Sequence, residues 1–394
     1  MKKENKWIGY CTNVHAGFDL DVTKANLEKY ALSVKQKCSP DNEMGIGLWL
    51  SANAVGEMIR QNQVREFAGW LETNQLVPFT FNGFPHGNFH QDVVKHLVYL
   101  PTWADDSRRE YSEQLADVID QLLPLGMEGS ISTLPLAWHD EKVDDEFLRQ
   151  SAKQLILLAR HLEELEKSRN RLVYFCIEPE PGCVMQTSQT CVDFFQKYLF
   201  GQSSQVDDLV RRYIRVCHDV CHSAVMFEEQ SEFIRNIYDA GIKIGKVQVS
   251  SAVHMNLHAM SEGQRMAAME QLRDFKEPRY LHQTVLQTSD DELEFYEDLP
   301  LAMERLDADI SRYSEARVHF HVPIFLKRFG ELETSQTEIL QCLEATQSID
   351  DLLHFEAETY AWGVLPEELR CSDDDENGLA AGISDEIQWL ANLA

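Results

Sequence analysis

The chain has no long uncharged apolar run, and this absence argues against a membrane-spanning helix. Nowhere in the sequence do ~18 apolar residues follow one another without a charge. No apolar core of signal-peptide length occurs in the opening stretch MKKENKWIGYCTN, so we expect no export signal. Basic residues are scarce, because 36 Lys and Arg stand against 65 Asp and Glu, a formal net charge of −29. A surface of this sign disfavours nucleic acid as a partner and direct insertion into an anionic membrane.

Several compositional and catalytic signatures are absent as well. No stretch rich in Pro, Gly or Ser divides the chain and no internal repeat is visible, so one large domain is favoured over two. The absence of a Walker loop, a nucleophile elbow and a dinucleotide fingerprint disfavours nucleotide hydrolysis, acyl transfer and hydride transfer. The nine cysteines are odd in number and scattered, which is typical of reduced thiols and predicts a cytoplasmic protein.

The sequence does contain a regular alternation of short apolar runs and helical stretches, which is typical of βαβ units with parallel strands. The eight runs are 7–13, 44–50, 76–82, 129–136, 172–178, 214–219, 244–249 and 352–358. They predict an α/β fold of the TIM (β/α)8 barrel type. The segment between the last two runs is far longer than one helix needs. Two strand-like pieces within it, Tyr280–Leu286 and Arg317–Val322, predict a β-hairpin inserted between strands 7 and 8.

The domain organisation follows from this pattern. We expect one barrel domain over residues 1–370, with the insertion at about 255–350, and an acidic C-terminal tail over 371–394. Within the tail, residues 371–378 (CSDDDENG) predict a solvated acidic loop. Residues 384–393 are amphipathic and predict a short helix that docks on the rest of the protein.

Strand parity selects the polar residues that face the barrel lumen, because side chains alternate between the two faces of a strand. In the fifth run the apolar residues share one face, which leaves Glu178 and Glu180 pointing inward at the carboxyl end. In the sixth run the same test selects Asp219 and not His218. In the last two runs the inward set includes Lys246, Gln248, Glu356, Glu358 and Tyr360. Catalytic residues of such barrels lie at the carboxyl ends of strands.

Carboxylates and imidazoles gathered in a partly desolvated barrel mouth repel one another unless a cation compensates them. Asp219 and His222, three residues apart, can meet at one metal ion together with Glu178. Oxygen and imidazole ligands without a thiolate set suit Mn²⁺, Mg²⁺, Co²⁺ or Zn²⁺. A simpler interpretation stays open for each signal: Glu178 as a loop carboxylate paired with an arginine, or His319 and His321 as exposed histidines of a hairpin.

The order of Glu in IEPEPG, Asp-x-x-His in DVCH and Glu in AETY resembles the xylose isomerase-like barrel superfamily of sugar isomerases, epimerases and endonuclease IV nucleases. The segments GYCTNVHAG, NGFPHGNFH, VYLPTW, HFHVPIF and ETYAWGVLP are more specifically similar to the EboE family of metabolite-traffic proteins. The resemblance covers nearly the whole chain. The resemblance implies a set of metal ligands. Taken together with the spacing of Asp219 and His222, the expected ligands are Glu178, Asp219, His222, Gln248, His321 and Glu358. Isomerases and epimerases usually have His where this chain has Gln248, and His254 slightly downstream is an alternative ligand.

The resulting hypothesis is a divalent-metal-dependent sugar or sugar-phosphate isomerase or epimerase that acts on a small polyhydroxylated or carbonyl metabolite. Glu178 and Glu358 form the expected catalytic pair, both as metal ligands and one as the base. The expected substrate contacts are Asn82, His90, Glu180, Lys246, His254, His319, Glu356 and Tyr360. The EboE resemblance implies a link to the export of a secondary-metabolite precursor, with other proteins of that pathway as partners. Two alternatives are a binding protein without catalysis, which Gln248 would allow, and an endonuclease IV-like phosphodiesterase, which the negative charge disfavours.

Overall fold

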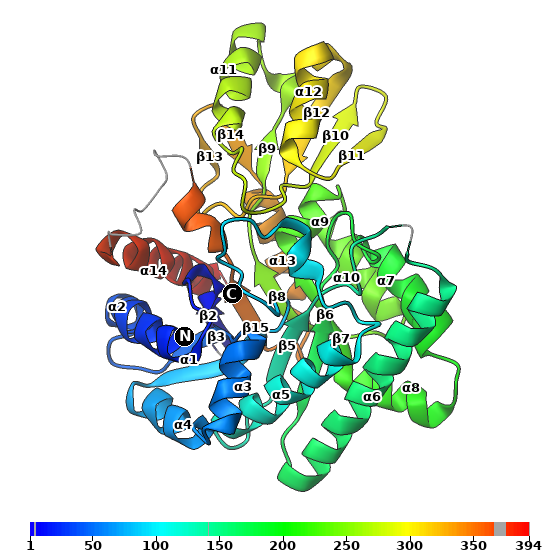
Figure 1. Ribbon diagram of the computed structural model, residues 1–394. Coiled ribbons are helices and arrows are strands. Elements are labelled where there is room, and N and C mark those ends of the chain that lie inside the picture. Colours follow the sequence, from blue (N-terminus) through cyan, green and yellow to red (C-terminus); the bar gives the residue numbers. More distant parts are fainter. Residues whose placement is uncertain (4, 141, 366–375, 394) are drawn as a thin grey trace.

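The computed structural model describes residues 1–3, 5–140, 142–365 and 376–393, and it contains a barrel with an additional small sheet on one side (Figure 1). The barrel sheet has the strand order β1-β2-β15-β8-β7-β6-β5-β4-β3. β1 (Lys2–Lys3) is a short antiparallel edge strand. A parallel bridge between Cys11 and Gly47 brings the two ends of the sheet together beyond β2 and β3. This arrangement confirms the predicted α/β barrel.

Each of the eight parallel strands overlaps one apolar run of the sequence. They are β2 (Lys6–Tyr10), β3 (Met44–Trp49), β4 (Leu76–Asn82), β5 (Gly129–Thr133), β6 (Val173–Ile177), β7 (Ile214–Asp219), β8 (Ile244–Val249) and β15 (His354–Ala357). Some strands are shorter than the runs because polar residues at their carboxyl ends turn into the loops of the barrel mouth. Thr12–Val14, for example, forms a 3-10 helix in place of the last residues of the first run.

The helices cover the outside of the barrel. They are α1 (Leu20–Asn26), α2 (Leu32–Cys38), α3 (Ala52–Arg60), α4 (Val64–Thr73), α5 (Asp106–Leu122), α6 (Asp145–Arg169), α7 (Ser188–Phe194), α8 (Ser204–Tyr213), α9 (Val220–Val225), α10 (Gln230–Asp239), α13 (Gln336–Thr346) and α14 (Glu376–Leu393). The longest, α6, begins where the Asp144 side chain accepts a hydrogen bond from the backbone N–H of Phe147 at 2.8 Å. It ends at Asn170, which adopts a left-handed conformation with φ 55°. None of the helices in the described part of the chain combines the length and apolarity that a bilayer crossing needs.

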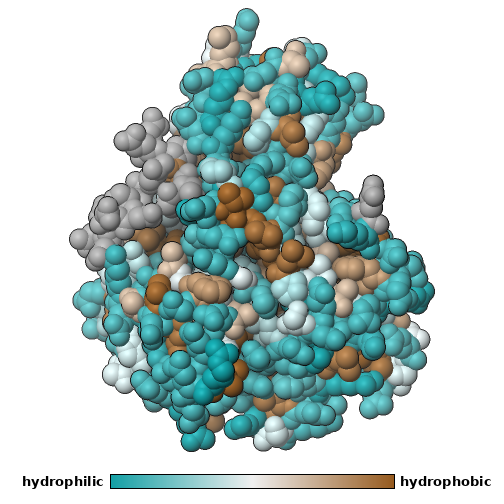
Figure 2. Space-filling view, in the orientation of Figure 1, coloured by the Kyte–Doolittle hydropathy of each residue, from teal (hydrophilic) through white to brown (hydrophobic). Residues whose placement is uncertain are grey.

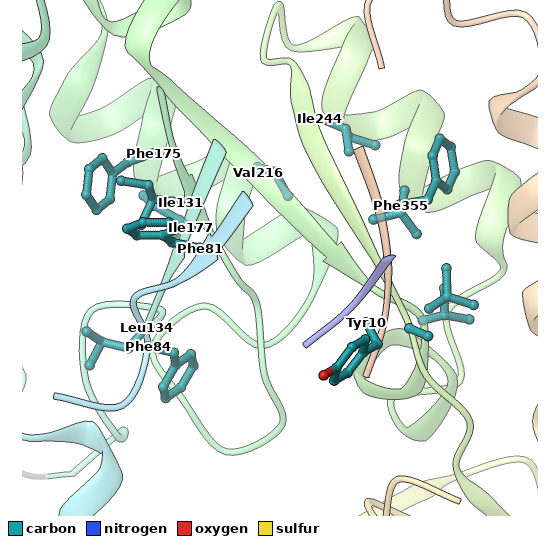
Figure 3. Packing of buried hydrophobic residues seen from close by; sticks show 14 of the residues in the cluster. Tyr10, Phe81, Phe84, Ile131, Leu134, Phe175, Ile177, Val216, Ile244 and Phe355 are labelled. Atoms are coloured by element: carbon teal, nitrogen blue, oxygen red, sulfur yellow. The ribbon is translucent and has the colours of Figure 1, made fainter. Parts of the chain in front are cut away.

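The main core lies between the barrel and its helices. Outward-facing strand residues, among them Phe81, Ile131, Phe175, Val216 and Phe355, are fully buried (Figure 3). These apolar residues alternate along each strand with residues that point into the lumen. The packing therefore fixes the rotational position of each strand, and with it the set of polar residues that reaches the barrel mouth.

The insertion between β8 and α13 is larger than the predicted hairpin. It contains a six-stranded sheet in the order β11-β10-β12-β9-β14-β13. The elements are β9 (Val253–Met255), α11 (Glu262–Arg273), β10 (Thr284–Thr288), β11 (Leu293–Tyr296), α12 (Leu299–Asp309), β12 (Tyr313–Val318), β13 (Arg328–Phe329) and β14 (Leu332–Thr334). The two predicted pieces overlap β10 and β12, which do pair antiparallel. The other strands are too short to give a periodic signal. The predicted range 255–350 also included α13, which packs against α10 of the barrel.

The C-terminal helix α14 lies against α2 and the barrel (Figure 1). The carboxyl group of Glu386 on this helix is buried and accepts hydrogen bonds from the backbone N–H of Ile324 at 3.1 Å and from Thr359 Oγ1 at 2.6 Å. Both partners lie in loops of the barrel mouth, so the helix is tied to them. Residues 371–375 of the predicted acidic loop lie outside the described residues.

Candidate metal centre

Three carboxylates from three strands converge at the carboxyl-terminal end of the barrel. Glu178 follows β6, Asp219 ends β7 and Glu358 follows β15. One carboxylate oxygen of each lies within 4.8 Å of the other two, and all three residues are buried. We call these residues the carboxylate cluster. In the described part of the chain, the ion pairs of this cluster involve histidines and no lysine or arginine.

The side-chain amide of Gln248 lies at the centre of the carboxylate cluster. Its Nε2 donates to Glu178 Oε1 at 2.9 Å, to Asp219 Oδ2 at 3.2 Å and to Glu358 Oε2. An amide nitrogen has two hydrogens, so it cannot satisfy three acceptors at once. The amide oxygen faces the thiol of Cys217 at 3.3 Å. A half-turn of the amide would direct this oxygen to the carboxylates, and that orientation suits a shared cation.

Burial and mutual repulsion disfavour the charged forms of these carboxylates. Burial, followed by the charges of Glu358 and Asp219, raises the pKa of Glu178 well above its ordinary value. Burial and then the charge of Asp219 raise the pKa of Glu358 in the same way. Burial also acts to raise the pKa of Asp219, but His222 and His321, together with hydrogen bonds from Ser250 Oγ and the backbone N–H of His222, outweigh it and lower that pKa. A bound cation would remove the repulsion and stabilise the ionised forms.

Three imidazoles lie beside the carboxylate cluster. His222 belongs to α9, whereas His319 and His321 follow β12. The Nε2 atoms of His222 and His319 are 3.2 Å apart, and the Nε2 atoms of His319 and His321 are also 3.2 Å apart. All three residues are buried. We call them the histidine cluster.

Hydrogen bonds at the other ring nitrogen fix the tautomer of each imidazole in the histidine cluster. Nδ1 of His222 lies 3.0 Å from a backbone carbonyl oxygen, and Nδ1 of His321 lies 2.7 Å from another. Nδ1 of His319 lies 2.7 Å from Oε1 of Gln283. These acceptors require a hydrogen on every Nδ1, so in the neutral rings every Nε2 carries a lone pair. The lone pair of His319 therefore lies next to those of His222 and His321, which is unfavourable unless a cation lies between them.

Two histidines of this cluster, His319 and His321, resist protonation. Burial, together with the neighbouring imidazoles, lowers the pKa of His319 well below its ordinary value. Burial, with a contribution from His222, lowers the pKa of His321 to about 4. These two rings are therefore neutral at neutral pH and available as metal ligands.

Asp219 and Glu180 connect the two clusters. A carboxylate oxygen of Asp219 lies within 4.8 Å of ring nitrogens of His222 and His321. A carboxylate oxygen of Glu180 lies within 4.8 Å of ring nitrogens of His222 and His319. Oε1 of Glu180 accepts hydrogen bonds from Tyr99 Oη at 2.8 Å and from Gln283 Nε2 at 2.9 Å. Among the described residues, the groups that could hold a divalent ion are therefore the carboxylate cluster itself and pairs of histidines combined with Asp219, Glu180 or Cys221.

Lys246 and Glu356 form a separate ion pair deeper in the lumen. The Lys246 ammonium donates to Glu356 Oε2, and both side chains are 0% exposed. The structure thus distinguishes the two glutamates of the eighth strand, because Glu358 and not Glu356 meets Glu178 and Asp219. Neither Lys246 nor Glu356 borders the cavity at the barrel mouth, where the sequence analysis expected them to contact substrate.

A cavity of about 70 Å³ opens above the two clusters. It lies between the loop after β4 and the insertion, which meet where the backbone N–H of Val94 donates to the carbonyl oxygen of Arg279 at 2.7 Å. Its polar side is formed by Asn13, Asn82, Glu178, Glu180, His222, His319, His321 and Glu358. Its apolar side is formed by Phe84, Pro85, Phe89, Val94, Val98, Tyr99, Tyr280, Leu281 and Tyr360, with Lys95 at the same border.

Two further predicted contacts lie away from this cavity. His90 borders a neighbouring cavity, and its Nε2 lies 2.6 Å from the carbonyl oxygen of Asn13. His254 lies on β9 of the insertion, where its Nε2 forms an ion pair with Glu315 at 2.7 Å. It cannot take the place of Gln248, because the chain leaves the barrel directly after β8 and carries His254 into the second sheet.

The structure adds residues that the sequence analysis did not select. Nδ2 of Asn13 donates to Glu358 Oε1 at 2.7 Å, and Nδ2 of Asn82 donates to the same oxygen at 2.9 Å. Asn13 closes the first apolar run, so the test that selected Asn82 at the end of the third run would also have found it. Gln283 and Tyr280 reach the site from the insertion, and no local pattern in the sequence points to them.

Comparisons with known proteins identify solved structures with a similar fold. No protein-family profile matches the chain, and no curated protein is detectably similar to it in sequence. A xylose isomerase-like TIM barrel protein from Mycobacterium smegmatis, solved in complex with magnesium, is 12% identical at a TM-score of 0.51, with 100% of both chains covered. The probable 3-DHS dehydratase AsbF of Bacillus anthracis is 11% identical at a TM-score of 0.48, covering 99% of this chain and 100% of that one. The first of these likenesses shows that the fold is that of the xylose isomerase-like barrels.

Proposed function

We propose that the protein is a divalent-metal-dependent isomerase or epimerase of a small hydroxy-carbonyl metabolite, which removes a proton from the carbon next to the carbonyl group. An isomerase returns the proton to the adjacent carbon, and an epimerase returns a proton to the opposite face of the same carbon. The observation that carries this proposal is the convergence of Glu178, Asp219 and Glu358, whose oxygens lie within 4.8 Å of one another without a lysine or arginine ion-pair partner among the described residues. Such a group is unfavourable in a buried site unless it binds a cation.

The described residues fit a metal ion in two respects. One oxygen of Glu178, Oε2, is buried and has no hydrogen-bond partner in the described part of the chain. In the histidine cluster, Nε2 of His319 lies 3.2 Å from Nε2 of His222 and 3.2 Å from Nε2 of His321. The carboxylate cluster, with the amide oxygen of Gln248, would hold Mn²⁺ or Mg²⁺, and the histidine cluster would hold Zn²⁺ or Co²⁺. When bound, the cation supplies a Lewis acid that polarises a carbonyl group and stabilises negative charge on its oxygen.

The two glutamates of the expected catalytic pair differ in their surroundings. Both oxygens of Glu358 accept hydrogen bonds, from Asn13 and Asn82 at Oε1 and from Gln248 at Oε2. Glu178 accepts only at Oε1, so its Oε2 is free to take a proton from a substrate carbon and return it to the neighbouring carbon. We therefore assign the base to Glu178, while Glu358 is held as a metal ligand.

The biological setting is part of the proposal. The similarity of several sequence segments to the EboE family supports a role in metabolite traffic, with export of a secondary-metabolite precursor and partners from the same pathway. The eight cysteines among the described residues are scattered, free and mostly buried, which supports a cytoplasmic location. Sugars and sugar phosphates are the first substrates to test, since the superfamily resemblance points to them.

The experiment is solvent exchange with metal-loaded protein in deuterium oxide. We expect deuterium to enter the carbon next to the carbonyl in a panel of ketoses, aldoses and smaller hydroxy-ketones. Glu178→Gln should abolish exchange while metal is still bound, and Glu358→Gln should reduce metal affinity as well. Glu72→Gln, an exposed position on α4, is the matched control. Ligand binding without exchange would favour the non-catalytic binding protein, and failure to bind any divalent ion would contradict the proposal.

A second candidate function is metal-dependent phosphodiester hydrolysis. The histidine cluster favours it, because two adjacent metal ions can activate water and stabilise the leaving oxygen. The net charge of −29 argues against duplex nucleic acid as the substrate. Hydrolysis of bis-p-nitrophenyl phosphate by zinc-loaded protein, lost in His319→Ala, would support this function, and no hydrolysis would exclude it.

A further inference from the structure

The cavity above the metal-ligand clusters has two unlike sides. Below are carboxylates and imidazoles, and opposite them are apolar side chains from the loop after β4 and from the insertion: Phe84, Phe89, Val94, Val98, Tyr280 and Leu281. Most of these apolar side chains are buried, so contacts with neighbouring residues hold them in place. A ligand held by the clusters would therefore extend toward an apolar surface.

Two of the three tyrosine hydroxyl groups on this apolar side are already engaged in hydrogen bonds. Tyr280 Oη donates to the carbonyl oxygen of Phe89 at 3.2 Å, and Tyr99 Oη donates to Glu180. Among the described residues that border the cavity, Lys95 is the one permanent cation, and it forms an ion pair with Asp298. Hydroxyl groups placed against Val94, Val98 and Leu281 would lose water without gaining partners, and a phosphate would find no free cation.

The apolar character continues outward from the cavity. An adjoining hollow of about 220 Å³ shares Pro85, Phe89, Val94 and Val98 with it. On the same segment, Val93 and Leu97 are 51% and 56% exposed. Figure 2 shows hydrophobic side chains gathered between the barrel and the insertion, in the region of this segment. An apolar approach of this kind suits a ligand that is itself partly apolar.

We propose that the substrate has an oxygen-bearing head that reaches the metal-ligand clusters and an apolar body, of about the width of an aromatic ring, that packs on Val94, Val98 and Leu281. This inference rests on the proposed function, since it assigns the head to the metal site. It narrows the substrate class from free sugars and sugar phosphates to hydroxy-carbonyl compounds with an aromatic or branched hydrocarbon portion.

The test compares two ligands with the same chelating head. Metal-loaded protein is titrated by calorimetry with acetohydroxamate and benzohydroxamate, and each affinity is corrected for binding to the free ion. We expect benzohydroxamate to bind about tenfold more tightly, because its ring is removed from water on the apolar side. Val94→Thr and Val98→Thr keep the side-chain shape but add a hydroxyl, and they should remove most of this difference. Leu125→Thr, at a position 94% exposed, is the matched control.

The outcomes separate the two proposals. Equal affinities for both hydroxamates, or tighter binding of xylose or xylose 5-phosphate, would overturn the inference and leave the metal-dependent function intact. If neither hydroxamate binds, the metal site fails, and saturation-transfer NMR of benzyl alcohol with metal-free protein decides the inference. A signal that is lost in the Val94→Thr/Val98→Thr double variant supports the apolar subsite, and no signal in the wild type overturns it.

Discussion

Gly47 on β3 allows a charged pair to be buried in the barrel lumen. A Cβ atom at this position would lie 1.3 Å from Glu356 Oε1 and 3.2 Å from Thr80 Cγ2. Gly47→Ala must therefore displace the carboxylate that accepts a hydrogen bond from Lys246, although both charged side chains are 0% exposed. Overpacking costs about 1–3 kcal/mol, and weakening a charge-assisted hydrogen bond in a buried pair costs about 1.5–3 kcal/mol. We expect Gly47→Ala to lower the free energy of unfolding by about 3–5 kcal/mol.

The matched control is Gly69→Ala on α4. A Cβ atom there would meet no other atom within 4 Å, so alanine should raise the free energy of unfolding by about 0.5–1 kcal/mol through its higher helix propensity. Equilibrium urea unfolding of both variants, followed by tryptophan fluorescence and circular dichroism, measures the difference. If Gly47→Ala is as stable as Gly69→Ala, the barrel lumen can accommodate the added methyl group without a loss of stability. The buried pair of Lys246 and Glu356 would then not constrain the eighth strand.

Three further predictions concern the site and its supports. Burial raises the pKa of Glu386 to about 7 from the ordinary value of 4.5; the folded protein then holds a proton that the unfolded chain releases. As pH rises from 4.5 to 7, the free energy of unfolding of the wild type should thus fall by about 3 kcal/mol relative to that of Glu386→Gln. Urea unfolding of both proteins at each pH measures this difference. Gln248→His should raise the affinity for Zn²⁺ or Co²⁺ by about tenfold in calorimetry, because imidazole is a better ligand than an amide, and unchanged affinity would exclude Gln248 from the ligand set. Since the pKa values of Glu178 and Glu358 are raised, metal binding should release protons, and buffers of different ionisation enthalpy should detect them; release that persists undiminished in the double variant Glu178→Gln/Glu358→Gln would contradict this.

The sequence predicted the barrel because the eight strands carry their own signal. Apolar runs and strand parity together indicated that Glu178 and Asp219 face the lumen, and both do lie at the barrel mouth. Parity could not indicate how far along the lumen a side chain reaches. Lys246 and Glu356 were for this reason expected at the substrate, whereas they pair with each other deeper in the lumen.

The insertion was harder to predict because its contributions depend on tertiary contacts. His319 was expected to contact substrate, but its Nε2 lies 3.2 Å from Nε2 of both His222 and His321, which places it beside these two histidines. This relation arises only when the chain after β12 returns to the barrel mouth beside α9. Leu281 likewise reaches the cavity through the packing of the insertion against the loop after β4.

The most direct test of the metal centre is the number of divalent ions per chain and the dependence of each ion on its ligands. Elemental analysis of protein dialysed against Mn²⁺ and Zn²⁺ should find two ions in the wild type. Glu178→Gln with Glu358→Gln should remove one of them, and His319→Ala with His321→Ala should remove the other. A wild-type chain that retains no ion, or ions that persist in both double variants, would show that these residues do not form a metal site.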